Sequence, residues 1–509
     1  MATRAGARYR PLMVRSLSSS LAQTPAAGVH GSFKGPPLSV GNPRMWRDKP
    51  LLKFAGLEHY FRTGTEAVAI LVTEAKRRDG DKKMYCEQFE ALMTSLTPVF
   101  DRAPRYAWLA KAFLEPERAI EFRVSFLDDS GSVRTHRGYR IQYSSTLGPY
   151  EGPLHFGESI SSDALKSNAL ASNFSHALGG ARLGGAAGGA NFDMSRASDA
   201  EIIRFCQAFM GELSKYIGPM TDLPSTGLAC GPTEVGYLYG HYKRTANAYA
   251  SHGRGLLWGG TVPHPESYGF GVVQFAKHLL NDRGDTLRGK RCLITGSGKM
   301  ALAVAERLIA HGAIPVTLSD TSGFVYEVDG FDESKFQKVA QIKEERGARI
   351  GRYILASTTA KYYDSHSTNI FGPDSPVFEQ GVDLVFPASR SSEIDHLQAT
   401  TFADKGCQLV VDAAHAPCTP AAIRTFKKLG IAYAPFKATL ATGATVGASL
   451  VDEVTCPDII KLIDDLAAKI YNDVSKTASE YNLRGDLNAG TNIASFLRVA
   501  NVMDAHGAI

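Results

Sequence analysis

The stretch KRCLITGSGKMALAVAERLIA, residues 290–310, decides the fold class of this chain. Its first part, Lys290–Thr295, is a short apolar run that predicts a buried strand, and the glycine-rich turn after it leads into a helix expected to end at Ala310. A second strand is predicted at Ile314–Ser319, directly before Asp320. Strand, glycine turn, helix, strand and acid follow one another within about thirty residues, as in a dinucleotide-binding βαβ unit.

Each part of this turn has a physical task in such a Rossmann unit. Gly296 allows the tight turn, Gly298 lets a pyrophosphate approach the backbone, and the small Ala301 lets the helix pack on the strand. The helix N-terminus faces the phosphates, and the acid can bind a ribose 2′-hydroxyl. The candidate cofactor-binding residues are therefore Gly296, Ser297, Gly298, Lys299, Met300 and Asp320. The alternative is that the turn is architectural, because a Rossmann helix packs best on small residues whether or not a nucleotide binds.

Patterns on both sides of this unit extend the α/β prediction. Downstream, Val382–Phe386 and Gln408–Asp412 are apolar runs typical of buried parallel strands. Upstream, Ile120–Phe126 alternates with period two, as a half-buried strand does, and Gly138–Tyr143 predicts a second strand. The cluster Gly179–Gly189, taken alone, predicts a loop in which backbone closely approaches backbone or a ligand.

Composition excludes several classes of protein. With 509 residues, of which 44% are apolar and 21% charged, the chain is expected to form two or three globular domains rather than a fibre or a disordered polymer. The sequence has no apolar run of the length that predicts a membrane span. Its seven cysteines form no CxxC pair, so neither a disulfide framework nor a cysteine zinc site is expected.

The charge balance does not indicate nucleic-acid binding. The formal net charge is +5, but seven of the 56 Lys and Arg residues precede Asp48, the first acid. The remaining 49 basic residues face 51 acidic ones, a net charge of −2. A near-neutral body offers no basic field to a phosphate backbone, so RNA binding through the Rossmann cleft has no positive support.

Residues 1–23 have the composition of a mitochondrial transit peptide. They are rich in arginine and serine, contain no acid, and include interspersed apolar side chains. The sequence therefore predicts a mitochondrial matrix location, with residues 1–50 as transit peptide and irregular lead-in. The alternative is a disordered tail that carries no address.

Several longer motifs resemble the glutamate dehydrogenase family (the Glu, Leu, Phe and Val dehydrogenases), in the same order, from about residue 60 to the last residue. They are Glu117–Val124, Leu147–Tyr150, Arg204–Met210, Ile217–Pro219, Glu234–Arg244, Trp258–Gly260, Ala416–Pro420 and Asn488–Phe496. The resemblance implies an α/β fold with an N-terminal substrate-type domain built on a mixed sheet, a Rossmann dinucleotide-binding domain, and C-terminal helices that return to the first domain. The implied boundaries are 51–260, 261–475 and 476–509.

The resemblance also implies an activity and an assembly. Members of the family reversibly deaminate L-glutamate to 2-oxoglutarate and ammonia, pass the hydride to NAD or NADP, and are often hexamers. The chemistry needs a lysine of lowered pKa that activates water, and an aspartate that relays protons. Two further lysines and a serine hold the substrate carboxylates, which would be costly to desolvate without partners.

This sequence departs from the family at these positions. The two substrate lysines correspond to Glu151 and Ser175, the catalytic lysine to Ala187, the aspartate to Gly227 and the serine to Gly447. Other substitutions lie nearby: a family arginine is His155, a threonine beside the nicotinamide is Tyr268, and two asparagines that contact the cofactor are Ser392 and His415. A carboxylate now stands where a substrate carboxylate would bind, and no intact catalytic residue or metal-ligand pattern is found.

These departures lead to one hypothesis and one rival. The hypothesis is a mitochondrial, catalytically inactive relative, a pseudoenzyme with a structural or scaffolding role in a larger assembly or as a homo-oligomer. The rival is an active NAD(P)-dependent glutamate dehydrogenase. The cofactor stays open between NAD, NADP and none: Asp320 favours NAD by charge, but some NADP-using members have a Ser-Asp pair here, like Ser319-Asp320.

The N-terminal segment supplies the first testable prediction. If it directs import, the mature protein isolated from mitochondria should begin between about residues 23 and 50, because transit peptides are removed after import. N-terminal sequencing of the endogenous protein measures this directly. A mature chain that begins at Met1 or Ala2 would show that the segment is not a cleaved address.

Overall fold

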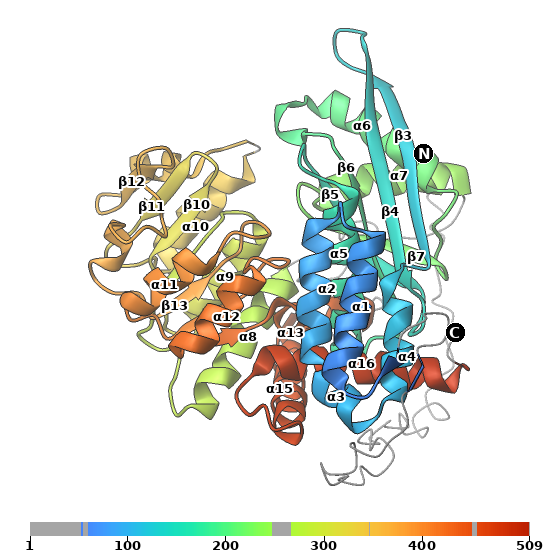
Figure 1. Cartoon of the computed structure of the whole chain (residues 1–509). Helices are drawn as coiled ribbons and strands as arrows, with labels where there is room; N and C mark the ends of the chain where they lie inside the picture. The colour runs from blue at the N-terminus through green and yellow to red at the C-terminus, as the bar shows by residue number, and fades with distance from the viewer. Residues whose placement is uncertain (1–51, 54–59, 247–265, 346, 450–455, 508–509) are drawn as a thin grey trace, which may run out of the picture. The chain divides into compact units, whose positions relative to one another are not determined.

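The computed structural model in Figure 1 describes residues 52–53, 60–246, 266–345, 347–449 and 456–507. The predicted transit peptide at residues 1–23 lies outside them. Residues 50–509 form one compact unit, which holds two main β-sheets with their helices. A short pair of strands and four helices come first: β1 Leu52–Lys53, β2 Tyr60–Phe61, α1 Gly64–Arg78, α2 Lys83–Ser95, α3 Thr97–Arg102 and α4 Arg105–Ala110.

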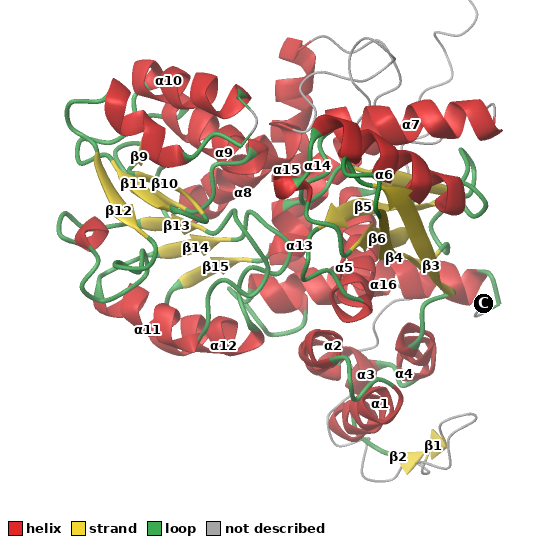
Figure 2. Cartoon of the chain, turned by 90° about the horizontal axis from the view of Figure 1, so that it is seen from above, coloured by secondary structure: helices red, strands yellow, loops and turns green. Residues whose placement is uncertain are grey.

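The first main sheet is mixed, as the family resemblance implied. Its strand order is β3-β4-β6-β5-β7; β3, β4 and β6 are antiparallel neighbours, whereas β5 runs parallel to both β6 and β7. The strands are β3 Arg118–Leu127, β4 Val133–Ser144, β5 Tyr150–Phe156, β6 Gly185–Ala190 and β7 Asp222–Ser225. Helices on both sides bury the sheet: α5 Ser162–Gly179 lies on one side, and α6 Asp199–Leu213 and α7 Pro232–Ala246 lie on the other (Figure 2).

The glycine cluster does not form the predicted loop; half of it is strand β6, buried at the centre of this sheet. A Cβ atom added to Gly185 would lie 2.4 Å from Cβ of Asn173 on α5. A Cβ atom added to Gly188 would lie 2.9 Å from Cδ of Arg140 on β4. The glycines are thus required by the close approach of a helix and of a buried arginine, not by a bound ligand.

The second main sheet is the predicted Rossmann sheet. Its order is β15-β14-β13-β8-β9 and every neighbouring pair is parallel. Its strands are β8 Arg291–Ile294, β9 Ile314–Pro315, β13 Leu384–Phe386, β14 Leu409–Val411 and β15 Ala432–Ala434. Its helices are α8 Glu266–Asp282, α9 Lys299–Ala310, α11 His396–Asp404, α12 Pro420–Leu429, α13 Phe436–Thr439 and α14 Ala441–Ser449.

The strand predicted at residues 314–319 is divided in two. After β9, the chain continues as β10 Thr317–Asp320, which pairs antiparallel with β11 Gly323–Tyr326, and β11 pairs with β12 Lys361–Asp364. This small sheet carries Asp320 at the end of β10. Helix α10 Glu333–Glu344 lies between β11 and β12 in the sequence. The short 3₁₀ helices are η2 Lys111–Leu114, η3 Met194–Arg196, η5 Ile350–Ala356 and η6 Pro376–Phe378.

The last helix returns to the helices beside the first sheet, as expected, whereas the helix before it packs mainly against this last helix, α8 and α14. Helix α15 Cys456–Glu480 is followed by α16 Leu487–Ala505, which packs against α5 and α4 (Figure 2). The Phe496 ring lies edge-on to three rings of the N-terminal helices, with centroid distances of 5.9 Å to Phe100 and 6.0 Å to Phe113 and Tyr106. Among the described helices, none is long and apolar enough to cross a membrane.

Candidate active-site cleft and nucleotide turn

The floor of the predicted substrate site is a buried ion pair. Glu151 lies on β5 and is only 4% exposed, and its Oε2 is 2.6 Å from Nε2 of His176 on α5. The other ring nitrogen of His176, Nδ1, is 2.7 Å from the carbonyl oxygen of Gly184, so it must carry a hydrogen. One further proton is therefore shared between Nε2 and the carboxylate. Whichever atom holds it, the pair has no net charge.

Tyr268 on α8 lies against this pair. A Cβ atom added to Gly443 on α14 would be 2.4 Å from Cγ of Tyr268, so the tyrosine ring rests directly on that glycine. Burial raises the pKa of Tyr268 above its ordinary value, and the nearby charge of Glu151 raises it further. The phenol thus occupies space beside Glu151 where the resemblance places a much smaller threonine.

Two histidines complete this cluster. His155, which lies on the same face of β5 as Glu151, accepts a hydrogen bond at Nδ1 from the backbone N–H of Leu228 at 2.9 Å. Its ring lies 5.9 Å from that of His415, centroid to centroid. Burial lowers the pKa of His155 to about 3, helped by the charges of His415 and Arg140. Burial also lowers the pKa of His415 to about 4, so both rings are neutral at pH 7.

The turn that follows β7 leaves no room for a side chain at Gly227. Gly227 and Cys230 exchange backbone hydrogen bonds of 2.9 and 3.1 Å, and the carbonyl of Leu228 accepts from the N–H of Phe156 at 2.9 Å. A Cβ atom added to Gly227 would lie 2.2 Å from the carbonyl oxygen of Leu154. The turn is therefore packed directly on β5, in the place where the resemblance expects a catalytic aspartate.

The remaining predicted positions lie around the same end of β5 and β6. Ala187 on β6 is fully buried and belongs to the apolar cluster that includes Phe174 of α5. Ser175 is buried and directly precedes His176, whereas Gly447 is half-buried on α14, four residues after the Gly443 that contacts Tyr268. The structure thus places Glu151 and Ala187 on neighbouring strands of one sheet and Gly227 in the turn that packs on β5. No group of His, Cys, Asp or Glu among the described residues could hold a metal ion.

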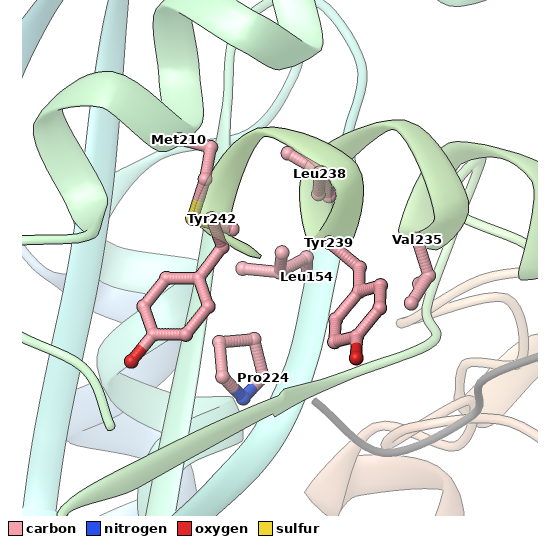
Figure 3. Close-up of a pocket in the computed structure, with 7 residues that line it drawn as sticks. All are labelled: Leu154, Met210, Pro224, Val235, Leu238, Tyr239 and Tyr242. Atoms are coloured by element: carbon pink, nitrogen blue, oxygen red, sulfur yellow. The ribbon is translucent and has the colours of Figure 1, made fainter. Parts of the chain in front are cut away.

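Two surface hollows lie apart from these residues. Figure 3 shows the first, an apolar cavity of about 10 Å³ below α7, where the Tyr239 and Tyr242 rings point toward Pro224 of β7. A volume of that size holds one water at most. The second, of about 450 Å³, is polar and lies on the β3–β4 hairpin. Neither contains a predicted site residue.

The nucleotide turn has the predicted geometry. Gly296 has φ +82°, which favours glycine, and its N–H donates to Oγ of Ser319 at 2.8 Å. Gly298 is the N-cap of α9 without a side-chain cap, and an added Cβ atom would meet no described atom within 4 Å. Lys299 is exposed beside it, Met300 is half-buried, and Ser297 is buried. The first amides of α9 are thus left to an anion such as a pyrophosphate.

Asp320 is already occupied by its own chain. Its Oδ1 accepts from the N–H and the hydroxyl of Ser322 at 2.8 and 2.5 Å, and its Oδ2 accepts from the N–H of Ile350 at 2.8 Å. Burial raises the pKa of Asp320, but these hydrogen bonds outweigh that effect and hold it below its usual value. Two cationic side chains lie close to Asp320. Arg349 donates a hydrogen bond to the hydroxyl of the neighbouring Thr321 at 2.6 Å, and Lys343 interacts electrostatically with the Asp320 carboxylate.

Sequence reasoning missed several of these residues. His176 gave no signal, because its partner lies across the sheet on another element. Lys343 and Arg349 also gave no signal, because nothing in the sequence shows that η5 returns to the end of β10. Ser392 stands where the resemblance places a cofactor-contacting asparagine. It is an exposed residue with φ +53°, a backbone conformation that serine rarely adopts.

Comparisons with known proteins agree on one family. The Glutamate/Leucine/Phenylalanine/Valine dehydrogenase profile matches residues 259–507, and the profile of the Glu/Leu/Phe/Val dehydrogenase dimerisation domain matches residues 116–244. The chain is 38% identical to the NADP-specific glutamate dehydrogenase of Chlorella sorokiniana over 86% of its own length and 84% of the relative. It is 33% identical to the NADP-specific enzyme of Giardia intestinalis, over 87% and 99% of the two chains.

A solved structure confirms the fold. The glutamate dehydrogenase of Plasmodium falciparum is 33% identical and superposes with a TM-score of 0.82, covering 90% of this chain and 98% of that one. The predicted α/β fold, with an N-terminal dimerisation or substrate domain and a C-terminal nucleotide-binding domain, is therefore correct.

The packing of the turn yields a stability prediction. Gly227→Ala should lower the free energy of unfolding by about 1–3 kcal/mol, because the new methyl group meets the Leu154 carbonyl at a distance no real contact allows. The control is Gly240→Ala on α7, where an added Cβ atom meets no described atom within 4 Å. That change should stabilise the chain by up to about 1 kcal/mol, the helix-propensity difference. Urea unfolding midpoints of the full chain measure both, and equal shifts in the two variants would contradict the described packing.

Proposed function

The chain belongs to the Glu/Leu/Phe/Val dehydrogenase family, and we propose that it is a catalytically inactive member with a structural role. The observation that carries the proposal is the buried Glu151–His176 pair, which stands at a family substrate-lysine position. The homologues are glutamate dehydrogenases by name, and that activity is the rival for this chain.

Charge is the first argument. A dicarboxylate enters a desolvated site only where cations or strong donors replace its hydration. The Glu151–His176 pair has no net charge, so it offers a substrate carboxylate none of the positive charge that a lysine supplies. Ser175 and Gly447 replace a further lysine and a serine. Each lost charged contact costs on the order of 1.5–3 kcal/mol, so three lower kcat/KM by about three to six powers of ten.

Missing proton chemistry is the second argument. The position of the catalytic lysine is Ala187, whose methyl group is part of a dry apolar core. The position of the aspartate is Gly227, where the contact with Leu154 excludes any side chain. Neither residue can activate water or relay a proton. Tyr268 fills part of the remaining space beside Glu151.

The nucleotide turn supports retained binding of a nicotinamide dinucleotide through its adenosine half, and NADP rather than NAD. Asp320 accepts three hydrogen bonds within its own loop, so it is poorly placed to select a free ribose 2′-hydroxyl. Lys343 and Arg349 lie close to it and would attract a 2′-phosphate. The rival, an active NADP-dependent glutamate dehydrogenase, draws its support from this same turn and from the NADP-specific relatives.

The proposed structural role rests on the dimerisation domain, which this chain retains. The dimerisation domain of the family is present, so the chain is expected to self-associate, and the largest expected oligomer is the family's hexamer. The acid-free N-terminal segment adds a mitochondrial matrix location to the proposal, in which the chain serves as a scaffold subunit of a larger assembly.

Activity is the direct test of the proposal. The purified chain should show no reduction of NAD or NADP with glutamate, and no oxidation of NADPH or NADH with 2-oxoglutarate and ammonia, above a protein-free blank. The double variant Ala187→Lys, Gly227→Asp should remain inactive, because the neutral Glu151–His176 pair still offers the substrate no cation and the turn cannot hold Asp in its present position. A turnover of about 1 s⁻¹ or more by the unmutated chain, in the usual enzyme range, would establish the rival instead.

Nucleotide affinity is tested separately by calorimetry. ADP-ribose 2′-phosphate should bind about 10–100-fold more tightly than ADP-ribose, the effect of one charged hydrogen bond. NADPH should bind no more tightly than ADP-ribose 2′-phosphate, because Tyr268 takes part of the nicotinamide space. Arg349→Gln should remove most of the preference for the 2′-phosphate, whereas Arg352→Gln, an exposed arginine paired with Glu345, should not. Much tighter NADPH binding would mean that the nicotinamide end is open.

A further inference from the structure

His155 connects the turn after β7 to strand β5. The N–H of Leu228, inside the turn, donates to Nδ1 of His155 at 2.9 Å, and the carbonyl of the same Leu228 accepts from the N–H of Phe156 at 2.9 Å. These two bonds bridge the turn to consecutive residues of β5. Among the residues that the structure describes, these two hydrogen bonds are the only ones that hold the Gly227–Cys230 turn, apart from the bonds within the turn itself.

The bond from Leu228 requires an unprotonated Nδ1. A backbone N–H can only donate, so the ring nitrogen facing it must offer a lone pair. The hydrogen of the neutral ring is therefore on Nε2, which has no hydrogen-bond partner among the described residues although the side chain is 93% buried. A proton added at Nδ1 would set donor against donor and place an uncompensated cation in the interior.

The groups around His155 do not favour its cation. Arg140 from β4 and His415 from the loop after β14 both oppose a positive charge on the ring. Glu151, on the same face of β5, is the nearest acid in the cluster, but it is paired with His176 at 2.6 Å. Tyr268 borders that acid from α8 and is neutral.

We propose that His155 is a pH-sensitive clamp: its neutral ring holds the Gly227–Cys230 turn on β5, and its protonation releases the turn. The turn is prepared for release, because Ala229 is held at φ +51°, a conformation that alanine rarely adopts. The proposal concerns the fold of this chain and stands whether or not the chain oxidises glutamate.

The direction and size of the effect follow from linkage. The pKa of His155 is about 3 with the turn closed and near the ordinary 6.5 once the ring is free, so the open state binds more protons. The closed turn is therefore fully favoured above about pH 6.5 and loses stability as the pH falls toward 3. The population of the open state should rise about 30-fold between pH 7.5 and pH 5. At pH 5 the free His155 ring, with a pKa near 6.5, is protonated about 30 times more often than it is neutral, and only the neutral ring can close the turn.

Cys230 reports the state of the turn. It is fully buried at the end of the turn, and burial raises the pKa of its thiol far above the ordinary value. In the full chain, labelling by 4,4′-dithiodipyridine, followed by mass spectrometry of the Cys230 peptide, gives the rate at which the thiol becomes accessible. Each rate is divided by that of the urea-unfolded chain at the same pH, which removes the chemistry of the reagent.

Three variants make the experiment specific. In the unmutated chain the normalised Cys230 rate should rise about 30-fold from pH 7.5 to pH 5. His155→Asn keeps an acceptor near the Nδ1 position but cannot titrate, so its rate should stay flat. His155→Leu has no acceptor and should label fast at both pH values. His136→Asn is the control. It changes a histidine on β4 whose Nδ1 lies 3.1 Å from the carbonyl oxygen of Asn191, and it should behave like the unmutated chain.

Cys292, buried on β8 of the other sheet, distinguishes release of the turn from global unfolding. Its normalised rate should not change between pH 7.5 and pH 5. A flat Cys230 rate in the unmutated chain, an equal rise in His155→Asn, or a parallel rise at Cys292 would each overturn the proposal.

Discussion

The N-terminal sheet depends on one buried ion pair, Arg140 with Asp222. Both side chains are completely buried, the Nε of Arg140 donates to Oδ2 of Asp222 at 2.9 Å, and Gln142 donates to the same oxygen at 2.8 Å. The arginine starts on β4, passes the surface of β6 and donates to the Gly152 carbonyl of β5 at 3.0 Å before it reaches β7. One side chain thus links strands that are not neighbours. Removing either partner would leave a buried unpaired charge, at a cost of about 3–5 kcal/mol.

This pair helps to explain why the central strand β6 carries only glycine and alanine. The arginine needs the space above Gly188, where an added Cβ atom would lie 2.9 Å from its Cδ. Gly152 on β5 is equally constrained, because a Cβ atom there would lie 1.7 Å from the carbonyl oxygen of Ala186. The ends of β5, β6 and β7 are consequently held close together by backbone contacts and by Arg140, and this frame does not depend on the side chains at positions 151, 187 and 227.

Local features could be predicted from the sequence, and non-local ones could not. The Rossmann turn was correct because Gly296, Gly298 and Ala301 act within one βαβ unit, and the capping box of Ser198 and Glu201 starts α6 for the same reason. The glycine cluster was assigned to a loop because its true causes, Arg140 and Asn173, lie on other elements. The hydrogen-bond partners of Asp320 could not be predicted for the same reason, since one of them is the N–H of Ile350, thirty residues later. The site residues could be located from the family resemblance, but the contacts around them could be described only from the structure.

Glu151 and the first amides of α9 differ in how their hydrogen-bonding groups are satisfied, because Glu151 is buried and the start of α9 is exposed. The amides of α9 remain available, since a helix N-terminus at the surface is satisfied by water when no phosphate is bound. A glutamate in the interior cannot remain unpaired, and here Glu151 is neutralised by His176 and bordered by Tyr268. Each of these residues now depends on the others. A lysine returned to position 151 alone would face the histidine with no carboxylate to neutralise it, an arrangement less favourable than the present one. The pairing that stabilises Glu151 therefore also opposes replacement of this residue by lysine alone.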